Sequence, residues 1–447
     1  MHRPPTRSAT RVACAAAVLG AGALALPTAA LAGGVVITGP SATASTGLMW
    51  TGFAADGALA AGPASALGSA LGSSTNHVVV TPTGTTVIVA DGNTIRAFPR
   101  DPDTGTVSGQ IDAETTTQVY VAGLALTPAG DRLYVVSTDN GFSNAIDAFT
   151  VSAGGGLTPV TPSVTTSDII GMPLVSPDGL SLYVMPLGTP RVIHQYDIGP
   201  SGALTPKATP TVNTGSNDLT VPVLTGGGTK LVAITSTGTG PEPVTYSINP
   251  ATGALTAPNS FPAGMGTGTM IMRVSPRGTF ALLSGSGTVR TLAIGADGTP
   301  GAMSARVTLV PSVAGGSTYT TTGFDLSPDG RWAYMAAFSR NVMDFPTGTQ
   351  PPPISIPVDP DGNVSTRVVS DLRQDIRYAK LIVAPVRPSV AALTVSAGLP
   401  GAATTLDASA STSPDAPITS YRWNFGDGSA PVTNASPTVT HNYVIKD

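Results

Sequence analysis

The chain has little cysteine, little charge and few aromatic residues. Of its 447 residues, 11% are charged, 5% are aromatic and a single one, Cys14, is cysteine. The formal net charge is −4 and only four residues are lysine. A nucleic-acid partner would require a basic stripe, which is missing here. A disulfide framework is also excluded, so the fold must be stabilised by packing.

Long apolar runs are missing as well, and the longest one lies close to the N-terminus. Arg3, Arg7 and Arg11 precede the segment VACAAAVLGAGALAL, which is too short for a membrane span and is followed by Ala30-Leu31-Ala32. This order predicts a signal peptide over residues 1–32, cleaved after about Ala32. Cys14 lies inside the apolar run without a lipobox, and the arginines are not paired. We therefore expect a secreted or cell-surface protein with no later membrane span.

Glycine and proline are abundant instead, with 52 and 41 residues, and many of them belong to a recurring motif. Examples are LALTPAGDRLYVV at 124–136, LVSPDGLSLYV at 174–184 and FDLSPDGRWAYMA at 324–336. Proline fixes φ and glycine permits a positive φ, so each motif predicts two strands joined by a tight turn. The turn glycines lie 46 to 52 residues apart, at Gly84, Gly130, Gly179, Gly228, Gly278 and Gly330.

A second hairpin signal alternates with the first. Its expected turn glycines are Gly57, Gly105, Gly156, Gly202, Gly253, Gly298 and Gly362. Two hairpins in about 50 residues make a four-stranded unit, and this period is typical of a β-propeller blade. The alternative, a parallel β-helix, has shorter repeats.

The two hairpin counts differ, and the difference predicts how the ring closes. There are seven second hairpins but six first hairpins, and the unmatched one lies at the N-terminal end. At the other end, residues 375–385 (DIRYAKLIVAP) contain a strand but no turn of this kind. We expect residues 376–384 to form the innermost strand of a shared blade, with outer strands from residues 35–60. The fold class is thus all-β, with a seven-bladed propeller over 33–385.

Residues 35–385 resemble the YVTN-type and lactonase-like seven-bladed propellers. The resemblance rests on the S-P-D-G turns followed by LYV, as at Leu182–Val184, and on the G-x-L-T hairpins. It implies the fold more than a function, because propellers host many activities.

The segment after Pro385 and Pro388 resembles a PKD domain, an immunoglobulin-like β-sandwich, over 386–447. The W-D-F-G-D-G hallmark of that family is here Trp423-Asn424-Phe425-Gly426-Asp427-Gly428, and its H-x-Y motif is His441-Asn442-Tyr443. Trp423 and Phe425 alternate onto one face, as core residues of a sandwich do. Members of the family continue beyond H-x-Y with about another strand pair, so we expect this domain to be C-terminally incomplete.

Candidate ligand-binding residues are few. Lactonase-like propellers act through polar residues in a central funnel, and at its mouth only Asn76 and His77 resemble the Pro-His start of that family, without the proline. Arg273 and Asp325 are the charged residues in the middle of innermost strands, each five residues before its turn glycine. They either pair, directly or through water, or act separately in the tunnel.

We therefore expect an exported, monomeric and non-enzymatic binding or surface-display protein. Its PKD module would contact an extracellular protein or polysaccharide, or space domains. No catalytic residue, metal ligand or cofactor is predicted, and the acidic DPDGN segment at 359–363 is interpreted as a turn. The alternative function is lactone hydrolysis by a lactonase-like propeller.

Overall fold

The structure of the chain is a computed structural model. It describes residues 31–39, 47–53, 65–67, 75–102, 105–139, 143–168, 170–186, 191–214, 219–237, 240–256, 258–260, 271–285, 288–309, 319–327, 330–339, 354–365, 368–369, 380–384, 392–396, 403–411, 421–423, 425, 429 and 432–443.

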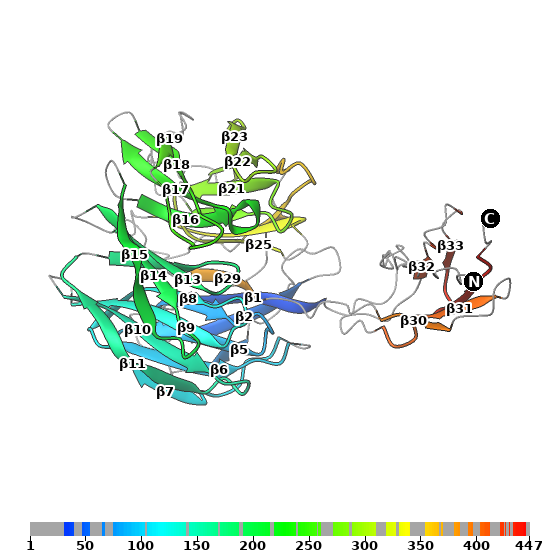
Figure 1. The fold of residues 1–447 in the computed structure, drawn as a ribbon, viewed down its shortest axis with the longest axis horizontal. Coiled ribbons are helices and arrows are strands. Elements are labelled where there is room, and N and C mark those ends of the chain that lie inside the picture. The colour runs from blue at the N-terminus through cyan, green and yellow to red at the C-terminus, as the bar shows by residue number, and fades with distance from the viewer. Residues whose placement is uncertain are drawn as a thin grey trace, which may run out of the picture. The chain divides into compact units, whose positions relative to one another are not determined.

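Seven antiparallel sheets, numbered here as blades 1 to 7, make up most of the chain (Figure 1). Blade 1 has the strand order β4 (Thr75–Val80), β5 (Thr86–Asp91), β6 (Thr94–Pro99) and β7 (Asp112–Thr115). Blade 2 has β8 (Tyr120–Leu126), β9 (Arg132–Thr138), β10 (Asn144–Val151) and β11 (Leu157–Thr166). Blade 3 has β12 (Ile170–Val175), β13 (Ser181–Pro186), β14 (Val192–Ile198) and β15 (Leu204–Asn213).

Blades 4 to 6 repeat this order. Blade 4 has β16 (Leu219–Thr225), β17 (Lys230–Thr237), β18 (Gly240–Ser247) and β19 (Asn259–Ser260). Blade 5 has β20 (Ile271–Val274), β21 (Phe280–Gly285), β22 (Thr288–Ile294) and β23 (Pro300–Met303), and β24 (Val307–Thr308) also pairs with β22. Blade 6 has β25 (Tyr319–Leu326), β26 (Trp332–Ser339), β27 (Ile354–Pro357) and β28 (Val368–Val369).

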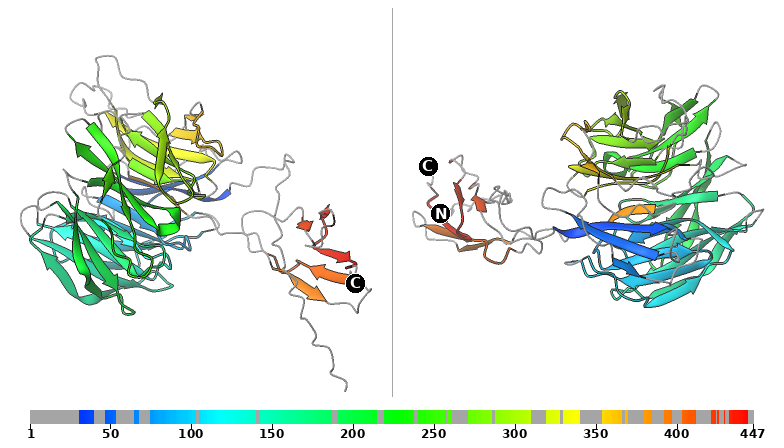
Figure 2. Two further views of the ribbon diagram at one scale, coloured as in Figure 1. Left: turned by 45° about the horizontal axis from the view of Figure 1, so that its top comes forward. Right: turned by 180° about the vertical axis from the view of Figure 1, so that it is seen from behind.

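Blade 7 joins the two ends of the propeller and confirms the expected closure. Its order is β29 (Lys380–Ala384), β1 (Leu31–Gly39), β2 (Gly47–Phe53) and β3 (Ser65–Leu67). Residues 376–379 of the expected strand lie outside the described residues, and β29 runs antiparallel to β1 with Gly34 opposite Ala384 and Thr38 opposite Lys380. Figures 1 and 2 show the orange β29 beside the blue β1. β29 also contacts the innermost strands β25 and β4, so the ring is complete.

The recurring turns have the backbone that the sequence predicted. The six first-hairpin glycines all have positive φ, between 72° and 92°. Five of these turns close through a bond from the glycine amide to the carbonyl three residues earlier, as from Gly179 to Ser176 at 2.9 Å. The proline-free turn instead forms a short 3-10 turn, Gly226–Gly228. One expectation was wrong: in blade 2 the positive φ of the second hairpin is at Gly155, with φ 87°, and not at Gly156.

Aliphatic and aromatic side chains fill the spaces between neighbouring blades. Between blades 2 and 3, for example, Tyr134 and Val136 of β9 pack with Leu182 and Val184 of β13, and all four are fully buried. The second strand of a blade is therefore apolar on both faces, because each face meets a different neighbour. This explains the continuous apolar runs that follow each turn glycine.

Residues Arg387–Asp447 fall outside the compact propeller unit, which spans Ala30–Val386. They contain a three-stranded sheet of β30 (Thr394–Ser396), β31 (Thr404–Asp407) and β34 (Thr438–His441), and a pair of β32 (Tyr421–Trp423) and β33 (Val432–Asn434). In the described part of the chain, no helix has the length and apolar character needed to cross a membrane.

Candidate functional site

The funnel mouth is built from backbone irregularities. Asn76 is the extra residue of a bulge in β4, because Thr75 lies opposite Asp91 whereas His77 lies opposite Ala90. Ala122 and Thr322 occupy the same bulge in β8 and β25. Bulges re-aim side chains at the end of a strand. His77 is half-buried, while the side chain of Asn76 is outside the described residues.

Arg273 and Asp325 form a direct ion pair between the innermost strands of blades 5 and 6. The Arg273 Nε lies 3.2 Å from Asp325 Oδ1, and the side chains are 41% and 18% exposed. Arg273 Nη1 also donates to the carbonyl of Met272, and Asp325 Oδ1 accepts from the Leu326 amide. Of the alternatives that the sequence left open, the direct pair is the one formed.

The opposite end of each blade carries the turns, and we call this side the turn face. The first and third strands of a blade run in the same direction, so both kinds of hairpin lie there.

A buried hydroxyl of one blade donates to the second-hairpin glycine carbonyl of the next. Between described residues, four such bonds run from Tyr134 to Gly202 (3.0 Å), Tyr183 to Gly253 (2.7 Å), Thr225 to Gly298 (2.6 Å) and Thr291 to Gly362 (2.5 Å).

Each of these hydrogen bonds holds two neighbouring blades together, and we call it a latch. Burial raises the pKa of Tyr134 and of Tyr183 to about 12, so both hydroxyls remain donors at neutral pH. A second contact accompanies three of these latches, since the turn glycine of one blade lies against the turn proline of the preceding blade, as Gly228 does against Pro177, whereas nothing in the described part of the chain lies near Gly278 of blade 5. The turn face is therefore tightly connected around much of the ring.

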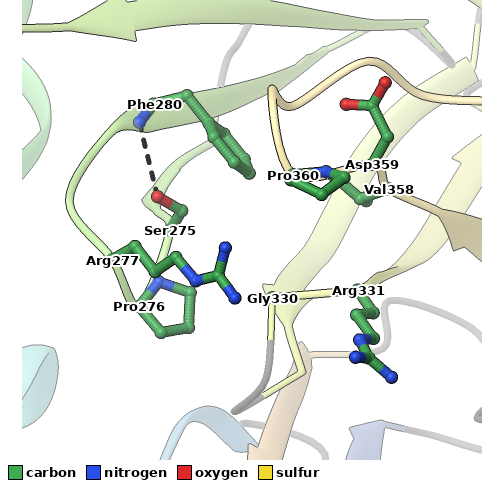
Figure 3. Close-up of a pocket in the computed structure, with 9 residues that line it drawn as sticks. All are labelled: Ser275, Pro276, Arg277, Phe280, Gly330, Arg331, Val358, Asp359 and Pro360. Carbon is green, nitrogen blue, oxygen red and sulfur yellow. Dashed lines mark hydrogen bonds between the residues drawn. The ribbon is translucent and has the colours of Figure 1, made fainter. Parts of the chain in front are cut away.

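Hollows lie between the hairpins on the turn face. One, of about 80 Å³, lies between blades 5 and 6 and contains Arg277, Phe280, Arg331 and Asp359 (Figure 3). In Figure 3, Arg277 and Phe280 come from one turn, while Arg331 and the Asp359 carboxylate lead away in opposite directions. The side chains in Figure 3 therefore do not converge on one point. The equivalent hollow between blades 2 and 3 has a volume of about 440 Å³.

The largest of these hollows, about 580 Å³, lies between blades 3 and 4 and collects charges that the sequence analysis missed. It is lined by Asp178, Asp197 and Lys207, with Thr209 and the hairpin Pro250–Ala254. The ammonium group of Lys207 donates to Asp197 Oδ1 and, at 2.7 Å, to the carbonyl of Thr252 in blade 4. Lys207 is thus a bridge between two blades.

Asp178 is the second carboxylate of this hollow. Partial burial raises its pKa, but bonds from the Ser176 hydroxyl and the Leu180 amide, together with the charge of Lys207, lower the pKa below its ordinary value. Both bonds reach Oδ1, at 2.5 Å and 3.0 Å. Asp178 is therefore an anion at neutral pH.

Two further polar groups were missed because their partners are distant in the sequence. Asp147 of β10 is buried and accepts bonds from Thr117, Ser137 and Ser163. His194 of β14 is buried, with Nε2 3.0 Å from Asp168 Oδ2 but not aligned as a hydrogen bond. Burial lowers the pKa of His194 more than Asp168 raises it.

In the C-terminal unit, the described motif residues have structural roles. Trp423 and Phe425 are buried with Leu406, Ala408 and Tyr421, which confirms their expected place in a core. Their neighbours His441 and Tyr443 extend this core, since His441 stacks on Phe425 at 3.8 Å between centroids and meets Tyr443 edge-on at 4.7 Å. Four residues of the expected motif lie outside the described residues, namely Asn424, Gly426, Asp427 and Gly428.

No group of three or more histidine, cysteine, aspartate or glutamate side chains that could hold a metal occurs among the residues the structure describes.

Comparisons with known proteins agree with this architecture. The PKD domain family matches residues 385–445. Among solved structures, the periplasmic gluconolactonase of Pseudomonas aeruginosa is 16% identical, with a TM-score of 0.61 over 79% of this chain and 99% of that one. A candidate 6-phosphogluconolactonase from Bacteroides fragilis is 15% identical, with a TM-score of 0.56 over 79% and 98%. A search of curated protein sequences found no match.

The chain therefore combines a lactonase-like β-propeller fold with a PKD domain. At these identities the likeness of the propeller extends to its fold alone.

Proposed function

We propose that this chain is an exported, non-enzymatic binding protein, in which the propeller presents a ligand-binding surface and the PKD domain contacts protein or glycan or spaces domains. The observation that carries the proposal is the Arg273–Asp325 pair. It replaces aliphatic residues such as Val79 and Leu174 at the same layer of the ring. With Arg273 41% exposed, solvent screens this partly buried pair and leaves it about 0.2–1 kcal/mol of stabilisation, so a role in binding is the better reason for its presence.

Export is part of this proposal. Cleavage after about Ala32 would remove the first two residues of β1, including Leu31 opposite Phe53, and would keep the continuous pairing of β1 with β29 from Gly34 onward. PKD domains are typical of extracellular proteins, which fits a mature chain that starts at Gly33. N-terminal mass spectrometry of the protein secreted by its natural host should find Gly33 as the first residue. A chain that is retained in the cytoplasm with residues 1–32 intact would contradict export.

Lactone hydrolysis is the second candidate, since two of the similar structures are gluconolactonase or candidate 6-phosphogluconolactonase proteins. His77 at the funnel mouth is the one described residue there with a suitable base. Purified mature protein should give only background hydrolysis of gluconolactone and its 6-phosphate at pH 7. Turnover that is lost in His77→Ala, in a protein with an unchanged melting temperature, would establish the enzyme instead.

The binding function itself is tested by co-sedimentation with insoluble cell-envelope polysaccharide from the host. We expect the mature protein to be found in the pellet and to be released by soluble fragments of the same polymer. A protein that stays in the supernatant, with and without its PKD domain, would contradict the proposal for polysaccharide.

A further inference from the structure

We infer that the hollow between blades 3 and 4 on the turn face binds one sugar residue of a neutral or amino-bearing glycan chain. This inference rests on the proposed binding function and names its ligand class and its place. The site is separate from the funnel and from the Arg273–Asp325 pair, which belongs to blades 5 and 6.

The size of the hollow suits a small ligand. Its volume of about 580 Å³ falls within the range of roughly 300–1,000 Å³ that is usual for small-molecule sites. Its walls come from three places: the first turn of blade 3, the strands β14 and β15, and the second hairpin of blade 4. The Tyr183–Gly253 latch fixes the two blades against each other at this point.

Two carboxylate oxygens are available in the hollow. Asp178 uses Oδ1 for both of its bonds, and Asp197 uses Oδ1 for Lys207. Within the described part of the chain, Oδ2 of each carboxylate has no hydrogen-bond partner. A carboxylate oxygen accepts charge-assisted bonds from hydroxyl or ammonium groups, and these are the donors that neutral and amino sugars provide. The side chain of Asp197 is 57% exposed, so a ligand can reach it.

The hydrogen bonds of Asp178 and Asp197 stay within blade 3, whereas Lys207 also bonds to the carbonyl of Thr252 in blade 4. The residues equivalent to Lys207 in blades 1, 2, 4, 5 and 6 are Gln110, Val160, Pro258, Met303 and Arg367, so one other blade also carries a cation at this position. Those equivalent to Asp197 in blades 1, 2, 4, 5 and 6 are Pro99, Thr150, Ser247, Ala293 and Pro357. Lys207 is only 4% exposed, and burying an ammonium group is costly unless it is paired. In a chain with 11% charged residues, two carboxylates that bond to no described residue of a neighbouring blade indicate recognition of a ligand.

Charge and shape define the ligand class. Two carboxylates face one ammonium group that is already bonded, so an acidic glycan would be repelled. Leu180 is 60% exposed at the rim and, with Pro250, provides an apolar surface for the C–H face of a sugar ring. Asp178 and Leu180 also line the hollow of about 440 Å³ between blades 2 and 3. Two adjoining hollows fit a chain of more than one sugar better than a single monosaccharide.

The test is calorimetric titration of the mature protein with three probes: hexamers of glucosamine, of N-acetylglucosamine and of galacturonic acid. We expect binding of the glucosamine or the N-acetylglucosamine hexamer and none of the galacturonic acid hexamer. Asp178→Asn should weaken binding about tenfold or more, since it removes a charged acceptor. The matched control is Asp297→Asn, which removes a carboxylate of similar turn geometry from blade 5 and should leave the affinity unchanged.

A second variant separates loss of the site from loss of the fold. Ala251 is exposed on the wall of the hollow, so Ala251→Trp should fill it without disturbing the Lys207 bridge, and binding should be lost while the melting temperature is kept. Unchanged binding in both Asp178→Asn and Ala251→Trp would overturn this site and leave the proposed function intact. If none of the hexamers binds, or if galacturonate binds best, the ligand class is wrong. Failure of the envelope co-sedimentation would instead count against the proposed function.

Discussion

At the scale of single residues, the buried charged side chains differ in how well the fold satisfies their hydrogen bonds. Asp147 is fully satisfied by hydroxyl and amide donors, whereas Arg100 is not. Arg100 is 3% exposed, and its Nη1 donates to the carbonyl of Gly84 at 2.9 Å. Its Nε and Nη2 are buried without a hydrogen-bond partner. Burial lowers the pKa of Arg100 despite the nearby charge of Asp101.

Replacing Arg100 with leucine should stabilise the propeller. The equivalent residues of the next five blades are all aliphatic, namely Val151, Ile198, Ile248, Ile294 and Val358. Removal of two unsatisfied buried donors should raise the free energy of unfolding by about 1–3 kcal/mol, measured by denaturant titration. Arg96→Leu is the control, because Arg96 is paired with Asp91 and Gln110, and it should give no gain. A loss of stability in Arg100→Leu would show that its guanidinium group is needed.

The Arg273–Asp325 pair should contribute little to stability. Because Arg273 is 41% exposed, solvent screens the pair, and we expect a coupling energy of about 0.2–1 kcal/mol. The measurement is a double-mutant cycle of Arg273→Met, Asp325→Leu and both together in denaturant. A coupling above about 3 kcal/mol would assign the pair to blade cohesion and remove the main support for its role in binding.

At the scale of the elements, the second-hairpin glycines do two things at once. A positive φ lets the hairpin turn, and the lack of a side chain lets the preceding blade approach. At Gly253, with φ 65°, a Cβ atom would lie 2.2 Å from Ser181 Oγ and 3.0 Å from Lys207 Nζ. The same position accepts the Tyr183 hydroxyl. The turn and the latch therefore depend on one residue.

Gly253→Ala and Gly92→Ala should separate these two effects. Gly92 has nearly the same φ, 64°, but nothing lies within 4 Å of its added Cβ. Gly92→Ala should lower the free energy of unfolding by about 1–2 kcal/mol, because alanine is strained at a positive φ. Gly253→Ala should cost about 1–2 kcal/mol more, because the Ser181 hydroxyl and the Lys207 ammonium group must move away from the added methyl group, which weakens the Lys207 bridge. Equal losses in thermal unfolding would mean that the inter-blade contact is soft.

The sequence predicted the elements better than the contacts between them. The turn glycines could be aligned because each one needs a positive φ, and the same alignment placed Arg273 and Asp325 in one layer. In the run Gly154-Gly155-Gly156 the sequence does not show which glycine has the positive φ, and the prediction of Gly156 was wrong. The latches were not predictable, since tyrosines of second strands, as in Tyr134, and threonines of other strands, as in Thr291, reach the same kind of carbonyl. Asp178, Asp197 and Lys207 have no shared spacing and come from the first turn, β14 and β15 of one blade, so they meet only when that blade is folded.

At the scale of the whole molecule, the propeller depends on one short strand from its C-terminal end. β29 supplies the innermost strand of blade 7, and it is hydrogen-bonded to β1 alone. It lies between β25 and β4 in the ring, so it connects the last blade to the first. Without it, β1 would become an open edge, and open edges promote aggregation.

Two truncations of the mature chain test this dependence. A chain that ends at Val386 keeps β29 and lacks the C-terminal unit, and we expect the propeller to melt within about 2 °C of the longer chain, since Ala30–Val386 is a compact unit by itself. A chain that ends at residue 379 lacks five more strand residues and their pairing with Gly34–Thr38. It should melt at least about 10 °C lower and should aggregate on heating, because a loss of several kcal/mol removes much of the stability of a domain. Addition of a synthetic peptide with the sequence of residues 376–386 should restore part of the lost melting temperature. Equal melting temperatures of the two truncated chains would show that the latches between blades hold the ring without its closing strand.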